Sequence, residues 1–167
     1  MKAYILDWNG TLTMLGNPCR ENDWCDRDAI KTFLGALHAR GDVTFGCSGM
    51  PPMYSRSWFT FGNDSYLTHH LEHLAHGPCA EKWECLEGRW YSAGRLMDPS
   101  LHGLPWEEQR DNWKEWDPSQ VTEIVISDDQ FIPDAKDLVR YSERVGTHVR
   151  FVHPRDLAAE LSDEPRE

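Results

Sequence analysis

The segment AYILDWNGTLT, residues 3–13, decides the fold that we expect for this chain. A short apolar run leads into Asp7, and Asn9, Gly10 and Thr11 follow at fixed spacing. An apolar run of this length that stops at a carboxylate is typical of a buried strand in a parallel sheet, covered on both faces. Ligands of such sheets bind at the carboxyl ends of the strands. The segment therefore predicts a buried strand with a polar site at its end.

The rest of the chain alternates between strand and helix patterns. We expect further strands over 42–48, 122–127 and 147–152, and helices over 26–41, 65–77, 105–116, 133–146 and 154–161. Residues 82–92 fit either one short strand or a hairpin. Strands that alternate with helices of this length form βαβ units. The pattern predicts an α/β fold, with a mostly parallel sheet and helices on both faces.

The composition is that of a globular protein in a reducing compartment. The chain has 167 residues, 40% hydrophobic and 27% charged, which is enough for one domain with its own core. We expect a single domain over 1–162 and an acidic tail over 163–167. No apolar run is long enough to span a membrane, and the first residues lack a signal-peptide pattern. Five cysteines without a CxxC pair indicate reduced thiols, so we expect a cytoplasmic protein.

The charge balance limits the partners of the protein. Its formal net charge is -11 at pH 7. A surface with this excess of acidic groups does not bind the phosphates of nucleic acid over a broad area. A small pocket for one phosphorylated end stays compatible with this charge.

Three polar motifs stand at the ends of predicted strands: ILDWNGTLT from residue 5, VTFGCSG from residue 43, and IVISDDQFIPDA from residue 124. With these motifs the chain resembles the haloacid dehalogenase (HAD) superfamily, whose commonest members are magnesium-dependent phosphatases. The resemblance runs from the first strand to the last helix. It implies a Rossmann-like HAD fold for residues 1–162, without a large cap domain over the site.

The resemblance also implies roles for the residues of the first two motifs. Asp7 matches the family's nucleophile, which attacks phosphorus and becomes an aspartyl phosphate. Thr11 and Ser48 would donate hydrogen bonds, with Ser48 holding a phosphoryl oxygen. Gly10 and Gly49 would complete the substrate-binding backbone beside them.

A magnesium site follows from the same resemblance. Asp128 and Asp129 match the acidic motif that binds Mg²⁺ together with Asp7 and the backbone carbonyl of Asn9. Hard oxygen ligands of this kind suit Mg²⁺, which keeps several of its waters. The adjacent pair of acids also argues for a cation independently, because two carboxylates at a buried strand end repel each other.

Asn9 departs from the family pattern. Family phosphatases usually have an aspartate at this position, which protonates the leaving oxygen and later activates water. An amide neither gains nor loses a proton near neutral pH, and general acid–base catalysis typically supplies about a hundred- to ten-thousandfold in rate. We therefore expect a slow phosphatase, or one that needs a good leaving group, with a long-lived phosphoenzyme.

The family's lysine, which neutralises the nucleophile and the phosphate, has several candidates. Lys114 and Arg110 lie four residues apart on one face of the helix expected over 105–116. Lys82 is more distant. We take Lys114 as the catalytic lysine, because it keeps the residue type, and Arg110 as a substrate-binding group.

The expected lack of a cap favours a large substrate, such as a phosphorylated protein or a nucleic acid end. The phosphatase domain of polynucleotide kinase-phosphatases is a reasonable comparison within the superfamily. It carries serine-glycine-arginine where this chain has Ser48, Gly49 and Met50. Methionine cannot replace the arginine's grip on phosphate, so nucleic acid ends are one option among several.

Two alternatives remain open from the sequence. A catalytically inactive HAD-like module could bind a phosphorylated ligand or a protein partner, which Asn9 favours. Separately, zinc could bind His69, His73 and His76 on one helical face with Cys79 and Cys85, although this spacing matches no usual zinc knuckle.

Overall fold

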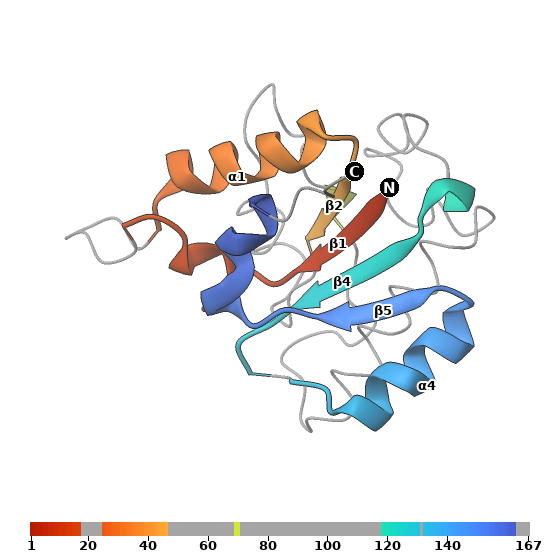
Figure 1. The fold of residues 1–167 in the computed structure, drawn as a ribbon. Helices are drawn as coiled ribbons and strands as arrows, with labels where there is room; N and C mark the ends of the chain where they lie inside the picture. The colour runs from red at the N-terminus through yellow and green to blue at the C-terminus, as the bar shows by residue number, and fades with distance from the viewer. Residues whose placement is uncertain (18–24, 47–68, 71–117, 131, 163–167) are drawn as a thin grey trace.

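The computed structural model describes residues 1–17, 25–46, 69–70, 118–130 and 132–162. This part of the chain contains one sheet, in the order β3-β2-β1-β4-β5, with every pair of neighbouring strands parallel (Figure 1). The strands are β1 Lys2–Leu6, β2 Val43–Gly46, β3 His69–His70, β4 Glu123–Ser127 and β5 His148–Phe151. The predicted parallel α/β architecture is confirmed.

β1 occupies the centre of the sheet. It pairs with β2 on one side and with β4 on the other, and Ile5 lies opposite both Phe45 and Ile126. The chain adds β2 and β3 on one side of β1 and then returns to add β4 and β5 on the other side. The direction of winding therefore reverses between β1 and β4. In open parallel sheets, the carboxyl ends of the strands at such a reversal border the ligand-binding crevice.

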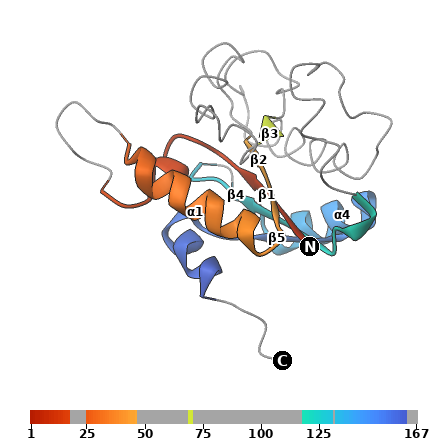
Figure 2. The same ribbon diagram turned by 90° about the horizontal axis from the view of Figure 1, so that it is seen from above.

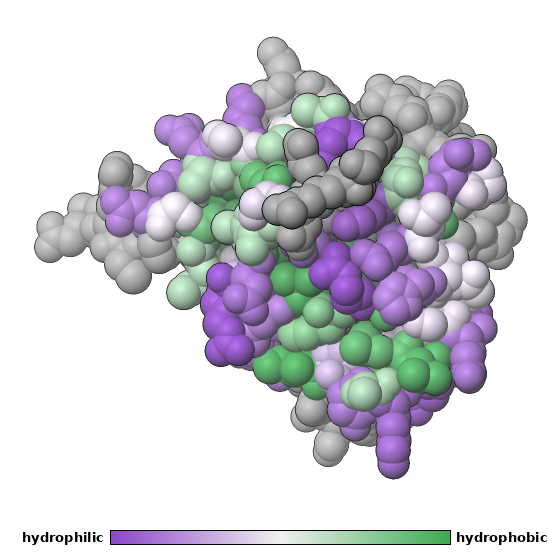
Figure 3. All heavy atoms as spheres, in the orientation of Figure 1, coloured by the Kyte–Doolittle hydropathy of each residue, from purple (hydrophilic) through white to green (hydrophobic). Residues whose placement is uncertain are grey.

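Helices cover both faces of the sheet (Figure 2). The helix α4, Ala135–Val145, packs on one face against a core that contains Ala3 and Ile5 of β1. The helix α1, Arg27–Ala39, packs on the other face with the 3₁₀ helices η1, Leu12–Met14, and η7, Pro154–Leu161, over Tyr4 and Leu6. Successive side chains of β1 therefore enter the two cores in turn, as expected from the two-residue period of a strand. Hydrophilic side chains line the outer rim of α4 (Figure 3).

Local signals in the sequence set the ends of the two long helices. Asp26 caps α1, and its side chain accepts a hydrogen bond from the Ala29 N–H at 3.1 Å. Asp134 and Asp137 form a capping box at the start of α4. Gly146 ends α4 in the left-handed conformation, with φ of 73°. These helices confirm the ranges expected over 26–41 and 133–146.

The helix expected over 65–77 is wrong at His69 and His70. These residues form the short strand β3, which pairs in parallel with Phe45 and Gly46 of β2. Backbone pairing with the edge of the sheet overrides the helical spacing of leucines in this segment. The other residues of 65–77, the region 82–92 and the helix expected over 105–116 lie outside the described residues. The last helix, over 154–161, is confirmed and is of the 3₁₀ type.

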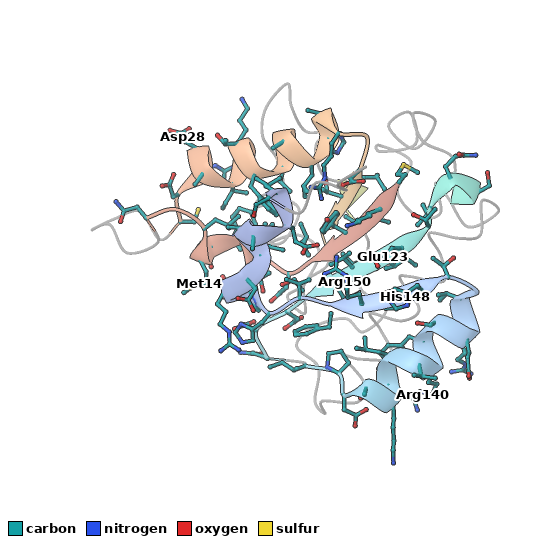
Figure 4. The ribbon with its side chains drawn as sticks, in the orientation of Figure 1. Met14, Asp28, Glu123, Arg140, His148 and Arg150 are labelled. Carbon is teal, nitrogen blue, oxygen red and sulfur yellow. The ribbon has the colours of Figure 1, made fainter. Side chains whose placement is uncertain are left out.

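A network of charged side chains fastens η7 to the sheet. Glu160 of η7 is buried, and its carboxylate accepts hydrogen bonds from Arg150 of β5, with an Nη2–Oε1 distance of 2.6 Å, and from the Tyr4 hydroxyl at 3.2 Å. Arg40 donates to the Tyr4 hydroxyl at 2.7 Å and to the Glu160 carbonyl at 2.7 Å. Arg150 also donates to Glu123 on the neighbouring strand β4 (Figure 4). We call these five side chains the η7 network.

Candidate functional site

Three carboxylates converge where the winding of the sheet reverses. Asp7 follows the end of β1, and Asp128 and Asp129 follow the end of β4. One oxygen from each of the three lies within 4.8 Å of the others. Sequence analysis predicted this set, and the parallel pairing of β1 with β4 brings its members together. We call these three residues the acidic cluster.

The backbone holds the acidic cluster in place from both strands. The Asp7 N–H donates to the Ser127 carbonyl at 3.2 Å, which extends the pairing of β1 with β4 one residue beyond the end of β1. The Asp128 Oδ1 accepts from the Gln130 N–H at 3.0 Å, which turns the chain away after β4. Asp7 is 8% exposed and Asp128 is 1% exposed, whereas Asp129 faces solvent. The cluster therefore has two buried carboxylates, Asp7 and Asp128, and one exposed carboxylate, Asp129.

The turn after Asp7 folds back against the cluster. The Leu12 N–H donates to the Asp7 carbonyl at 3.4 Å, and the Gly10 N–H donates to Thr13 Oγ1 at 2.9 Å. Gly10 has a φ of 74°, and a Cβ at this position would overlap the Asp129 carboxylate. Only glycine combines this conformation with so close an approach. The structure therefore places Gly10 against the cluster.

Thr11 and Asn9 differ in their exposure. Thr11 is fully buried, and its hydroxyl makes no hydrogen bond among the described residues. The hydroxyl of Ser127, which directly precedes Asp128, is also buried and without a hydrogen bond in this part of the chain. Such a group costs about 1–3 kcal/mol unless a ligand satisfies it. Asn9 is exposed and brings an amide to the edge of the site, where it cannot transfer protons.

Several predicted site residues lie outside the described residues. They are Ser48, Gly49, Arg110 and Lys114, with the alternative lysine Lys82 and the zinc candidates His73, His76, Cys79 and Cys85. The helical face on which the zinc hypothesis relied is not present at His69, because that residue belongs to β3.

His153 is a residue at this edge that sequence analysis missed. β5 ends at Phe151, and the Val152 N–H donates to the Ile126 carbonyl at 2.9 Å, so the chain stays beside β4 up to this point. His153 follows and caps η7. Phe151 pairs with Ile126, and His153 lies two residues after Phe151 just as Asp128 lies two residues after Ile126. That offset was visible in the sequence, but a single histidine after a strand matches no motif.

Comparisons with protein-family models, with curated proteins and with solved structures find no match for this chain. Among the described residues, none of the helices has both the length and the apolar character needed to cross a membrane.

Proposed function

We propose that this protein is a Mg²⁺-dependent phosphohydrolase or phosphotransferase of the HAD type that acts through an aspartyl phosphate on Asp7. The observation that carries the proposal is the acidic cluster, in which oxygens from two strands meet within 4.8 Å at the reversal of the sheet. Like charges repel, so carboxylates that gather from the ends of two strands favour a cation between them. A site for a cation and a phosphoryl group accounts for this arrangement.

The donor set fits magnesium. Asp7, Asp128 and Asp129 offer carboxylate oxygens, and Mg²⁺ prefers such hard ligands while keeping some of its water. When bound there, Mg²⁺ would offset the negative charge of the carboxylates and of the incoming phosphate. The buried Thr11 hydroxyl offers a further polar group for a ligand oxygen. The Asn9 backbone carbonyl, which the family uses as a metal ligand, is part of the turn beside them.

Asp7 is the residue whose position best suits a nucleophile. Its N–H and its carbonyl are both hydrogen-bonded, to Ser127 and Leu12, so the backbone that carries the carboxylate is fixed. A fixed nucleophile loses little freedom on reaching the attacking geometry. The Asp7 oxygen would form a bond to phosphorus while the bond to the leaving oxygen breaks, and that oxygen keeps the electron pair. Attack by water on phosphorus would then release phosphate and restore the Asp7 carboxylate.

Asn9 determines the rate in this proposal. Neither proton transfer, to the leaving oxygen or from the attacking water, can use an amide. Substrates whose leaving group departs without taking up a proton, such as acyl phosphates, would react best. Hydrolysis of the aspartyl phosphate would be slow, and transfer to another acceptor could compete with it.

The fold and cellular setting of the proposal rest on the same features. A Rossmann-like HAD fold agrees with the central position of β1 and with the sheet order. An open site without a large cap would admit a phosphorylated protein or a nucleic acid end. The compartment we propose is the cytoplasm, in line with the cysteine pattern.

A binding module is the second candidate function, and the exposed Asn9 favours it. The acidic cluster would then hold a cation that recruits a phosphorylated ligand or protein partner without turnover. The two functions differ in one observable, which is covalent phosphate on Asp7.

The test is phosphate release from an acyl, an aryl and a 3′-phosphorylated oligonucleotide substrate, with and without Mg²⁺, together with mass spectrometry of the intact protein. We expect Mg²⁺-dependent release from the acyl phosphate and an added phosphoryl group on wild type that Asp7→Asn lacks. Asn9→Asp should raise turnover of the aryl phosphate by about a hundredfold or more. If neither wild type nor Asn9→Asp is phosphorylated or releases phosphate, the binding module is the better description.

A further inference from the structure

We propose that His153 is a binding residue of the same site, whose neutral imidazole donates a hydrogen bond from Nε2 to an oxygen of the phosphorylated ligand. This inference rests on the proposed function, because it assigns a second contact to the ligand held at the acidic cluster. Three observations carry it: the position of His153 in the sheet, the hydrogen bond that fixes its tautomer, and its remaining donor.

The register of the sheet places His153 in line with the acids. One row of paired residues crosses β1, β4 and β5, and it consists of Ile5, Ile126 and Phe151. Two positions further along each strand come Asp7, Asp128 and His153. An extended chain returns its side chain to the same side of the sheet after two residues, and His153 is extended, with φ of -64° and ψ of 141°.

The spacing of strands gives the distances involved. Neighbouring strands lie about 4.8 Å apart, so His153 starts about one strand spacing from Asp128 and about two from Asp7. It is therefore too far along the edge to be a metal ligand with all three acids. It is placed instead to reach an outer oxygen of a ligand whose phosphoryl group sits between the acids and β5.

A backbone hydrogen bond fixes the protonation of the ring. The Arg155 N–H donates to His153 Nδ1 at 3.2 Å, which caps the start of η7. Nδ1 must keep its lone pair to accept this bond, so in the neutral ring the proton is on Nε2. Nε2–H is then a donor, and none of the described residues accepts a hydrogen bond from it. His153 is half-buried as a residue, which leaves part of it open to a ligand.

A neutral donor has a clear use at this edge. The acidic cluster needs a cation to bind phosphate, and a second cation next to it would compete for the same carboxylates. An Nε2–H group attracts a phosphoryl oxygen without adding charge. Because the tautomer is set by the cap, the donor is oriented before the ligand arrives, and no proton has to move when it binds.

The test uses two substitutions that separate the cap from the donor. His153→Asn keeps an oxygen that can accept from the Arg155 N–H, since asparagine is a good N-cap, but it removes the Nε2 donor. His153→Gln carries an amide N–H₂ that reaches farther and can replace this donor. His148→Asn is the matched control, because His148 stands at the opposite end of the same strand and is exposed.

The measurements are the Kd of inorganic phosphate at saturating Mg²⁺, the Kd of Mg²⁺ alone, and the ¹⁵N shifts of the His153 ring. We expect His153→Asn to bind phosphate about tenfold more weakly, as for the loss of one hydrogen bond to an anion. His153→Gln should recover part of that loss. The Mg²⁺ affinity should be unchanged in both, His148→Asn should behave as wild type, and the ring shifts should show the proton on Nε2.

Failure of this inference is distinct from failure of the proposed function. Wild-type phosphate affinity in His153→Asn, or a neutral ring with its proton on Nδ1, would overturn the role of His153 and leave the acidic cluster untouched. Wild type that binds no phosphate at saturating Mg²⁺ would overturn the proposed function, and the inference would fall with it.

Discussion

The acidic cluster and the η7 network both bring acids together from distant parts of the sequence, but they do so in opposite ways. In the η7 network the buried carboxylate of Glu160 lies 2.6 Å from the guanidinium of Arg150 and accepts a hydrogen bond from the Tyr4 hydroxyl, to which Arg40 donates. In the acidic cluster, one oxygen of each of the three carboxylates lies within 4.8 Å of the other two. The first arrangement is satisfied by the fold itself, and the second gains most from an added cation. The difference separates a structural contact from a ligand site.

The pKa of Glu160 shows that contacts within the fold stabilise its charged form. Burial alone would raise the pKa of this carboxyl, but the hydrogen bonds and charge of Arg150 outweigh burial and lower it. The pKa of Arg150 is raised, chiefly by its hydrogen bond to Glu160 and against its own desolvation. Each partner favours the charged form of the other, so the folded state stabilises both charges without a ligand.

The largest effect should come from Asp7→Asn. This variant removes the nucleophile but keeps the size of the side chain, so we expect complete loss of the phosphoenzyme and a fall in turnover of about ten-thousandfold or more. Without Mg²⁺ its free energy of unfolding should equal that of wild type or exceed it, because one of three repelling charges is gone. Urea denaturation with and without Mg²⁺ checks this. Marked destabilisation without metal would show that the fold itself needs the Asp7 charge, which would contradict the assignment of the acidic cluster as a ligand site rather than a structural contact.

The η7 network should respond in the opposite way. Glu160→Gln removes the carboxylate that accepts hydrogen bonds from Arg150 and from the Tyr4 hydroxyl. Among the described residues, Arg150 then keeps only Glu123 as an acidic partner, and we expect the free energy of unfolding to fall by about 2–3 kcal/mol. This is below the usual cost of breaking a buried pair because Arg150 is about a third exposed. Mg²⁺ should not restore the loss. Asp156→Asn, on the exposed side of η7, is the control, with an expected change within about 0.5 kcal/mol. Equal effects of the two variants would mean that the network does not hold η7.

Gly10→Ala tests whether the turn is built for the acidic cluster. Alanine at a φ of 74° is strained, and its Cβ would displace the Asp129 carboxylate, so we expect a loss of about 1–3 kcal/mol in stability and a clearly weaker Mg²⁺ affinity. Gly41→Ala is the matched control. Gly41 also has a positive φ, of 91°, but its Cβ would meet nothing within 4 Å. It should lose stability alone, measured by urea denaturation, and keep the metal affinity measured by calorimetry.

The smallest predicted effect is the pH dependence of the η7 network. The pKa of Glu160 is lower when folded than when unfolded, so the unfolded chain binds this proton at a higher pH. The contribution of Glu160 to stability is therefore complete above the ordinary glutamate range, near pH 4.3, and is lost as the pH falls through the lowered folded value. Urea denaturation of wild type and Glu160→Gln from pH 3 to 7 should show their difference shrinking toward acid pH. A constant difference would assign the loss to packing.

Local sequence signals predicted most of the described fold. Asp26 and Asp134 are helix caps and Gly146 is a helix end, and each acts through contacts within a few residues of itself. The buried strands follow from short apolar runs for the same reason. The acidic cluster could also be predicted, because Asp7 and Asp128 each follow such a run and parallel strands end at one edge.

What the sequence could not predict depends on partners that are distant along the chain. His69 and His70 sit in a segment with helical spacing, and only the edge of β2 makes them a strand. The pairing of Glu160 with Arg150 and Tyr4 joins the two ends of the chain, and nothing near Glu160 in the sequence marks it as buried. The position of His153, two residues beyond the pairing of Phe151 with Ile126, required the register of β5 on β4.

The sequence by itself therefore determined the elements, their caps and the chemical groups at the strand ends, because these depend on the period of apolar residues and on backbone groups nearby. Tertiary structure alone decided which of those groups meet. Register across the sheet brings Asp7 and Asp128 together and aligns His153 with them, and the docking of η7 gives Glu160 its partners. Both outcomes are set by contacts between strands and helices, whose energies no single segment contains.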